Sequence, residues 1–111
     1  MRARRPSACR LPNGLGIWMA ATVQRRDGLA LHGYLSLPPG VAKPYPTVVY
    51  VHGGPWARDE HLNGDPMLPF LTNRGYAVLQ VNYRGSSGYG RAHMEKARGE
   101  FAGRMHDDLV D

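Results

Sequence analysis

The sequence predicts an α/β fold in which an antiparallel N-terminal hairpin leads into an incomplete parallel sheet flanked by helices. The first observation is the pair Asp27-Gly28, which lies between two stretches of strand-forming residues and is a strong hairpin signal. The second is two short apolar runs, at residues 47–51 and 76–81, each with the length of a buried strand. The third is a helical pattern between these runs, because a strand-helix-strand order is typical of parallel strands.

The hairpin is predicted from alternation on either side of its turn. Residues 19–26 form a weak strand pattern, and four leucines in residues 29–37 share one parity, although Gly33 interrupts the series. This alternation indicates an antiparallel pair with one covered face. Pro38-Pro39-Gly40 ends the second strand, and residues 41–46 are expected to form a loop.

The parallel part begins with residues 47–51, which are apolar at both parities, as expected of a strand buried on both faces. Asp65 followed by Pro66 predicts the start of a helix, and Gly75 predicts its end. The inner face of this helix would hold Met67, Leu68, Phe70 and Leu71.

The remainder of the chain continues the α/β pattern. Residues 76–81 predict a second buried strand, and residues 82–90 form a glycine-rich loop. Helical patterns follow at residues 91–98 and 105–111. The predicted sheet is therefore incomplete when the sequence given ends.

Composition and charge limit the classes of protein to which the chain can belong. The 111 residues suffice for about one small domain, and the 42% of hydrophobic residues can form a core. The formal net charge of +5 comes from residues 1–26, which hold six arginines and no acid. Because the basic residues do not spread over the rest of the chain, we expect no nucleic-acid partner.

Residues 1–18 are predicted to be a poorly structured basic leader, either a targeting segment or an unstructured start, and residues 19–111 a folded unit. Pro12 and Gly14 interrupt the leader, so it lacks the apolar core of a secretory signal. No apolar run approaches the ~20 residues of a membrane-spanning helix, so no membrane association is expected. Cys9 is the only cysteine, which favours a cytoplasmic protein.

Two glycine-rich loops follow the predicted parallel strands, at residues 52–64 and 82–90. In open α/β sheets, ligands bind beyond the carboxyl ends of the strands. Gly53 and Gly54 lack a Cβ, so their N–H groups can be presented to an incoming atom. In an acyl-transfer enzyme, such donors stabilise the oxygen of a tetrahedral intermediate by about 3–4 kcal/mol. The alternative is a plain tight turn.

Several motifs occur in a fixed order: RDG at 26–28, GYL at 33–35, LP at 37–38, VHGGPW at 51–56, RGYAVL at 74–79, NYRGSSGYG at 82–90 and DDL at 107–109. In these motifs the chain resembles the start of the catalytic domain of the prolyl oligopeptidase family of serine peptidases. The resemblance is strongest to the acylaminoacyl-peptidase and dipeptidyl-peptidase-like branch. It implies a partial α/β-hydrolase fold, a Ser-Asp-His hydrolase that cleaves peptides, and a β-propeller domain N-terminal to this chain in the parent protein.

Individual residues have candidate roles in such a site. The backbone N–H of Gly54, and second that of Gly53, would be the oxyanion donors. Trp56 and Tyr83 are candidate walls of the substrate cleft, with packing an equal alternative. Arg84 is a further substrate-binding candidate, although an ion pair that fixes its glycine-rich loop is the favoured role. His52 is expected to orient the oxyanion loop rather than to act as a base, because the base comes last in chain order in this fold.

The nucleophile elbow G-x-S-x-G is absent from the sequence. Neither Ser86 nor Ser87 has glycine two residues before and two residues after it. We therefore expect the nucleophile, acid and base to lie outside this chain, which should be inactive alone. We also expect it to aggregate, because the strand at 47–51 would lack a neighbour.

The remaining polar residues suggest no metal or cofactor. The four other histidines do not have the spacing of a zinc site. They are His32, His61, His93 and His106. Asp107-Asp108 could be a pair of catalytic carboxylates, but acids at a helix N-terminus are the favoured interpretation.

Two alternatives to a peptidase remain open. The parent protein could be a carboxylesterase on the same fold, because a fold does not determine its substrate. The chain could also be a complete, non-catalytic binding module.

Overall fold

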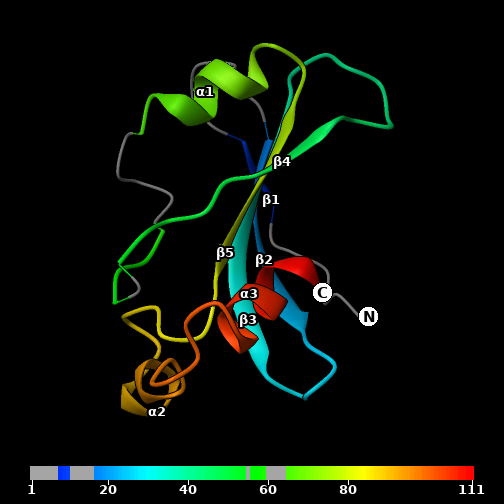
Figure 1. Cartoon of the computed structure of the whole chain (residues 1–111). Coiled ribbons are helices and arrows are strands. Elements are labelled where there is room, and N and C mark those ends of the chain that lie inside the picture. The colour runs from blue at the N-terminus through cyan, green and yellow to red at the C-terminus, as the bar shows by residue number, and fades with distance from the viewer. Residues whose placement is uncertain (1–7, 11–16, 55, 60–64) are drawn as a thin grey trace.

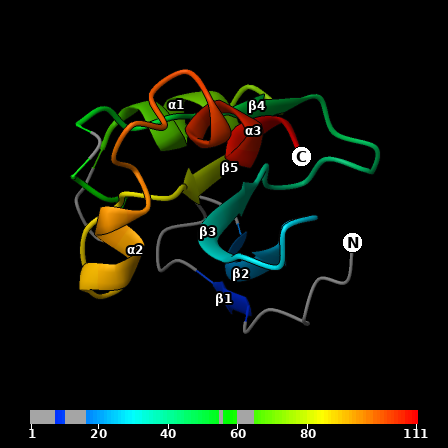
Figure 2. The ribbon, with the colours of Figure 1, turned by 60° about the horizontal axis from the view of Figure 1, so that its bottom comes forward.

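The computed structural model describes residues 8–10, 17–54, 56–59 and 65–111, which form one mixed sheet with three short helices (Figure 1). The strands lie in the order β1-β2-β3-β5-β4, which is visible along the sheet in Figure 2. They are β1 (Ala8–Arg10), β2 (Ile17–Gln24), β3 (Ala30–Leu37), β4 (Thr47–Val49) and β5 (Ala77–Asn82). The helices are α1 (Met67–Thr72), α2 (Arg91–Glu95) and α3 (Arg104–Val110). This arrangement confirms the predicted partial α/β-hydrolase fold.

The hairpin of β2 and β3 turns at the predicted Asp-Gly pair. Gly28 has a φ of 84°, and its N–H donates to Arg25 O at 3.0 Å. The Asp27 carboxylate accepts the N–H of Leu29 at 3.1 Å, which fixes the turn from its other side. β2 begins at Ile17, two residues earlier than predicted, and pairs antiparallel with β3 along its whole length. β1, which lies within the predicted leader, pairs antiparallel with β2 and has no counterpart in the sequence prediction.

Gly33, which interrupts the leucine series, lies where β3 approaches β5. The two strands pair antiparallel, with Gly33 opposite Val81. A Cβ at position 33 would overlap the carbonyl oxygen of Gln80. The glycine therefore permits close pairing between the hairpin and the parallel part of the sheet.

β4 and β5 pair in parallel, as predicted, but they differ in burial. β5 is buried along nearly its whole length, which confirms the expectation of a buried strand for residues 77–81, whereas Tyr76 lies before the strand and is exposed. The expectation that 47–51 is buried on both faces is wrong: Val49 and Val51 are each 45% exposed. β4 lies at the end of the strand order and has β5 as its neighbour among the described strands. The apolar side chains of Val49 and Val51 therefore remain exposed.

The start and end of α1 follow from the predicted signals. The Asp65 carboxylate accepts the N–H of Met67 at 2.9 Å. At the other end, Gly75 has a φ of 89°, its N–H donates to Thr72 O at 3.0 Å, and the N–H of Tyr76 donates to Leu71 O at 3.2 Å. These two bonds form a Schellman motif, in which a residue with positive φ ends the helix.

The predicted inner face of α1 is only half correct. Leu68 and Leu71 are partly buried and Thr72 is buried, but Met67 and Phe70 are exposed. Residues 68, 71 and 72 share one side of a helix, and α1 contacts β3 and β5. Met67 and Phe70 lie on the neighbouring side, which no described element covers.

The last two helices lie near the end of the sheet at which β5 ends, whereas α1 lies at the opposite end (Figure 1). Tyr83, Ala97 and Met105 form a buried apolar cluster there, with Leu109 packed against it. α2 ends at Glu95, three residues before the end of its sequence pattern. In the described part of the chain, no helix has the length and apolar character needed to span a membrane.

The exposed face of β4 predicts self-association of the 111-residue chain. Val49→Lys should lower its light scattering at micromolar concentration, because a charge on an edge strand opposes strand-to-strand pairing. Val110→Lys, which changes an exposed valine of α3, is the matched control and should leave scattering nearly unchanged. Equal effects of the two substitutions would contradict an edge-strand origin of the aggregation.

Candidate functional site

The loops that follow β4 and β5 lie together, as the sequence predicts for the carboxyl ends of parallel strands. The Tyr83 hydroxyl donates to His52 O at 2.7 Å, and the His52 Nε2 lies 3.0 Å from the Ser86 Oγ. The N–H of Ser87 donates to Ala57 O at 2.9 Å. These bonds attach the loop at residues 52–59 to the loop at residues 82–90 at several points.

The paired glycines lie in the first of these loops, outside any helix or strand, and both are exposed. Among the residues that the structure describes, neither the N–H of Gly53 nor that of Gly54 has an acceptor. Gly54 has a φ of 132°, and a Cβ there would lie 3.0 Å from the Ala57 Cβ. A Cβ at Gly53 would meet nothing within 4 Å. Gly54 is therefore the position at which this loop requires glycine.

His52 is held by both of its ring nitrogens. Its Nδ1 lies 2.9 Å from Gly53 O, and because a carbonyl oxygen only accepts, Nδ1 carries the hydrogen. In the neutral ring Nε2 then accepts the hydrogen of the Ser86 hydroxyl. The ring also stacks on Tyr83, with centroids 4.6 Å apart. These contacts agree with an orienting role for His52, because they attach its ring to both loops.

Asn82 and Asp59 form a second link that the sequence did not reveal. The Asn82 Oδ1 accepts the backbone N–H of Asp59 at 2.8 Å, and the Asn82 Nδ2 donates to Asp59 O at 3.1 Å. Both residues are buried, and burial raises the pKa of the Asp59 carboxyl, which the neighbouring His52 partly opposes. A polar amide at the end of an apolar strand was the available sequence signal.

The two aromatic candidates for the cleft wall differ in position. Tyr83 is buried, with its ring against His52 and its hydroxyl bonded to the backbone, which supports packing. Trp56 is 52% exposed, and its ring meets that of Phe101 edge to face, with centroids 6.4 Å apart. Only Trp56 is therefore placed where a substrate could reach it.

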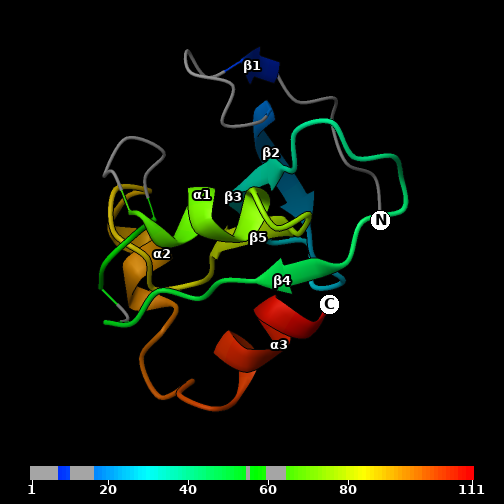
Figure 3. The same ribbon diagram turned by 90° about the horizontal axis from the view of Figure 1, so that it is seen from above.

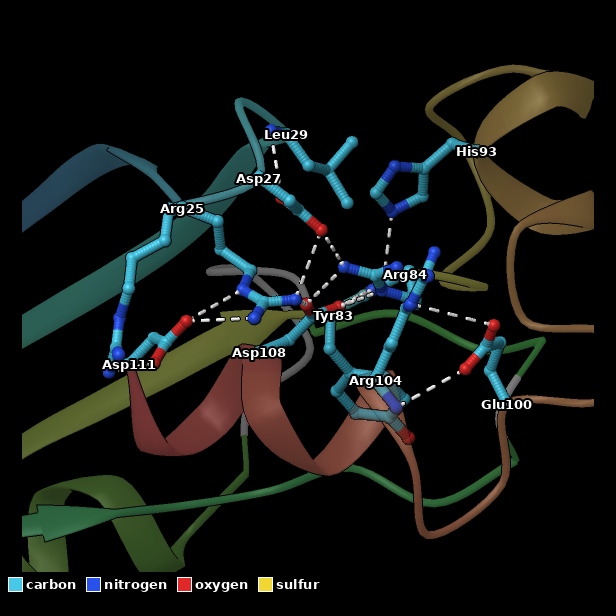
Figure 4. A network of polar contacts seen from close by, with 11 residues as sticks. Arg25, Asp27, Leu29, Tyr83, Arg84, His93, Glu100, Arg104, Asp108 and Asp111 are labelled. Carbon is cyan, nitrogen blue, oxygen red and sulfur yellow. Dashed lines mark hydrogen bonds and ion pairs between the residues drawn. The ribbon is translucent and has the colours of Figure 1, made fainter.

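Arg84 forms a buried ion pair rather than an exposed contact for substrate. It is 4% exposed, and its Nε and Nη2 donate to the two oxygens of Asp108 at 2.9 and 2.8 Å (Figure 4). The Arg84 Nη2 also donates to the Asp27 carboxylate at 2.7 Å. The backbone N–H of Arg84 donates to Asp108 as well, at 2.8 Å. The geometry therefore supports the structural role for Arg84 and not substrate binding.

Arg25 extends this network at the hairpin turn. Its guanidinium donates to Asp108 at 2.8 Å, to Asp111 at 2.8 Å and to Asp27 at 3.2 Å. Asp108 is thus a buried counter-ion in the middle of α3, whereas Asp107 lies in the first helical turn. The expectation of acids at a helix N-terminus is correct for Asp107 and wrong for Asp108, because buried arginines, not the helix dipole, account for the latter.

The histidines form no metal centre in the described part of the chain. His93 is buried and donates from Nε2 to Tyr83 O at 3.1 Å, and burial lowers its pKa. His61 lies outside the described residues. No group of three or more His, Cys, Asp or Glu side chains that could hold a metal occurs among residues 8–10, 17–54, 56–59 and 65–111.

An open cavity of about 580 Å³ lies between the hairpin turn and the segment that joins α2 to α3. No residue of the loop at 52–59 lines it, so it is separate from the glycine pair. Most of its charged lining residues are paired with one another, as in the bond of 2.8 Å between Arg98 and Glu95. This cavity therefore gives no independent indication of a ligand.

Comparison with known proteins supports the resemblance to peptidases over most of the chain. The BD-FAE family model matches residues 34–94. The chain is 48% identical over 97 residues to a dipeptidyl aminopeptidase BIII of Pseudoxanthomonas mexicana, an alignment that covers 80% of this chain and 14% of the relative. It is 41% identical over 108 residues to dipeptidyl peptidase family member 6 of Caenorhabditis elegans, covering 78% of this chain and 14% of the relative.

Solved structures resemble the chain in three dimensions as well. A puromycin-hydrolyzing peptidase of Mycobacterium tuberculosis superposes with a TM-score of 0.80 at 32% identity, covering 92% of this chain and 17% of that protein. A puromycin hydrolase superposes with a TM-score of 0.70 at 29% identity, covering 94% of this chain and 15% of that protein. The chain therefore spans about one seventh of the length of the curated relatives it matches.

Removal of the buried carboxylate of Asp108 should destabilise the fold strongly. Asp108→Asn leaves two buried guanidinium groups without their shared counter-ion, so the free energy of unfolding should fall by about 3–5 kcal/mol. The control is Glu100→Gln, which breaks a more exposed ion pair with Arg104 and should cost less than about 1 kcal/mol. Urea unfolding followed by tryptophan fluorescence gives both values, and similar losses would contradict the assignment.

Acid should destabilise the fold through Asp27 and Asp111. A hydrogen bond from Arg84 lowers the pKa of Asp27, and one from Arg25 lowers the pKa of Asp111. Their stabilising contribution is therefore present at neutral pH and is lost as the pH falls through the lowered pKa values, below about 4. The unfolding free energy should drop over this range, and Arg84→Met should reduce the drop. An equally large acid effect in the variant would contradict this origin.

Proposed function

We propose that this chain, which belongs to the prolyl oligopeptidase family and matches the BD-FAE family model, is the N-terminal part of the catalytic domain of a serine peptidase. Family membership makes it part of a hydrolase of α/β-hydrolase fold. The serine-type mechanism, the peptide substrate and the role of the glycine loop are the proposed steps. A β-propeller domain preceding this chain and a cytoplasmic location belong to the same proposal.

The proposal rests on the backbone N–H groups of Gly53 and Gly54, which have no hydrogen-bond acceptor among the described residues. They follow β4, the loop that holds them is attached to the loop after β5, and no described acceptor occupies them. An oxyanion hole needs donors that are fixed in place before the reaction and have no competing partner. Gly54 is the first candidate, because its conformation and the crowding at Ala57 both require glycine.

In the proposed reaction the hydroxyl of a serine outside this chain adds to the peptide carbonyl carbon. Its proton passes to a histidine, which then gives it to the leaving amine as the C–N bond breaks. Water later releases the acyl group from the serine by the same route. The part of this chain is to donate hydrogen bonds to the carbonyl oxygen while it carries negative charge.

The proposal is tested by expressing the longer protein that contains this chain and assaying aminoacyl and dipeptidyl anilides against simple acyl esters. Cleavage of the anilides, with inactivation by a serine-directed fluorophosphonate, is expected. Preference for acyl esters would favour a carboxylesterase, and full activity after the fluorophosphonate would exclude a serine nucleophile. The 111-residue chain alone should show no hydrolysis, because no G-x-S-x-G segment occurs in it.

The two glycines offer a matched pair of substitutions in the longer protein. Gly54→Ala forces an unfavourable φ and a contact with Ala57, so it should shift the donor and lower kcat by roughly 10²-fold. Gly53→Ala meets no neighbour and should change kcat by less than about threefold. Steady-state kinetics on one anilide measures both. Equal effects, or an effect on KM alone, would contradict a role for Gly54 in the transition state.

A further inference from the structure

We propose that Asn82 is a positioning residue, whose side-chain amide fixes the loop at residues 52–59 and so sets the direction of the glycine N–H groups. This inference rests on the proposed function and adds a residue to it. Asn82 itself contacts no glycine and no reacting atom. It acts through the backbone of Asp59, at the end of the described loop.

The contact between Asn82 and Asp59 is a closed pair of hydrogen bonds. The amide oxygen accepts the N–H of Asp59 at 2.8 Å while the amide nitrogen donates to the carbonyl of the same residue at 3.1 Å. A side chain thus bonds both backbone groups of one residue, as a neighbouring strand would. Because Asn82 is 0% exposed, water cannot replace these bonds when they break.

The side-chain amide of Asn82 cannot rotate by 180° and exchange the positions of its oxygen and nitrogen. Its Nδ2 also donates to the Tyr89 hydroxyl at 2.8 Å. A rotated amide would place its NH2 group against the N–H of Asp59, donor against donor, and its oxygen against the Asp59 carbonyl. Tyr89 is itself stacked on His32, with centroids 4.9 Å apart, and packs edge to face on His93 at 5.4 Å. The orientation of Asn82 is therefore fixed by its surroundings.

The glycines lie between points at which the loop is held. His52 precedes them and is held by the Tyr83 hydroxyl, whereas Ala57 and Asp59 follow them and are held by Ser87 and Asn82. The glycine N–H groups make no bond of their own to a described residue, so their direction depends on these anchors. A displacement of about 1 Å in a reacting geometry can cost about 10²-fold in rate.

The decisive variant is Asn82→Leu in the longer protein, because leucine has a similar size and can make neither bond. Its kcat on an anilide substrate should fall by 10- to 100-fold while KM changes by less than about threefold. Thr72→Val is the matched control. It removes the hydroxyl of an equally buried residue that bonds Leu68 O in α1, and should leave kcat within about twofold.

Asn82→Asp provides a signature that a purely structural residue would not give. The carboxylate keeps the acceptor for Asp59 N–H but loses the donor to Asp59 O, and protonation restores a donor. The ratio of its kcat to that of the wild type should therefore rise as the pH falls from 8 to 5. Position 82 is 0% exposed and lies against Asp59, and both burial and a neighbouring carboxylate favour the protonated form of a carboxyl group. A ratio independent of pH would contradict the donor role.

Hydrogen exchange tests the loop without any activity. In Asn82→Leu the amides of Asp59, which loses its bond to Asn82, and of Ser87, which donates to Ala57 O in the loop, should exchange at least about tenfold faster than in Thr72→Val, as expected when a local anchor is lost. Unchanged exchange, or equal loss of kcat in Asn82→Leu and Thr72→Val, would overturn the inference. If the wild-type protein cleaves no peptide or ester, the proposed function fails instead, and the exchange result still decides whether Asn82 fixes the loop.

Discussion

The buried pair of Arg84 and Asp108 is the constraint on which the arrangement of the loops depends. It joins the end of β5 to α3, and through Asp27 and Arg25 it joins both to the hairpin turn. Burying two charges is costly unless the geometry satisfies nearly all of their hydrogen bonds. Here the two oxygens of Asp108 receive bonds from both arginines and from a backbone N–H, so the charges are satisfied only when the three segments are placed together in this way. Figure 3 shows β5, α3 and the hairpin of β2 and β3 from above.

Three consecutive residues at the end of β5 hold three different parts of the molecule. Asn82 bonds the backbone of Asp59, Tyr83 bonds the backbone of His52, and Arg84 bonds Asp108. Asn82 is the last residue of β5, and the chain turns at Arg84, so neighbouring side chains can reach separate segments. Because its ion pair with Asp108 holds Arg84 in place, the side chains of Asn82 and Tyr83 reach the loop at residues 52–59 from fixed positions. The ion-pair network and the loop at residues 52–59 are thus connected through residues 82–84.

Local signals in the sequence predicted the described elements other than β1, but not the contacts between distant segments. The turn at Asp27-Gly28 and the end of α1 at Gly75 were predictable, because hydrogen bonds within a few residues determine them. The exposure of Val49 was not predictable, since the burial of a strand depends on the strands beside it. The roles of Asp108 and Asn82 were missed for a similar reason: both residues were visible, but their partners lie more than 20 residues away.

In the candidate site, the residues that hold the loop in place differ from the glycines proposed to donate hydrogen bonds to the substrate. If Gly53 or Gly54 were held by bonds from its own N–H, those bonds would have to break before a developing oxyanion could be stabilised, and their cost would raise the barrier. An unpaired N–H is tolerated only where water can reach it, and both glycines are exposed. The stiffness of the loop must then come from other residues, whose bonds persist throughout the reaction. The buried amide of Asn82 and the hydroxyl of Tyr83 meet this requirement of the proposed function, because they bond the loop at Asp59 and His52 and not at the two glycines.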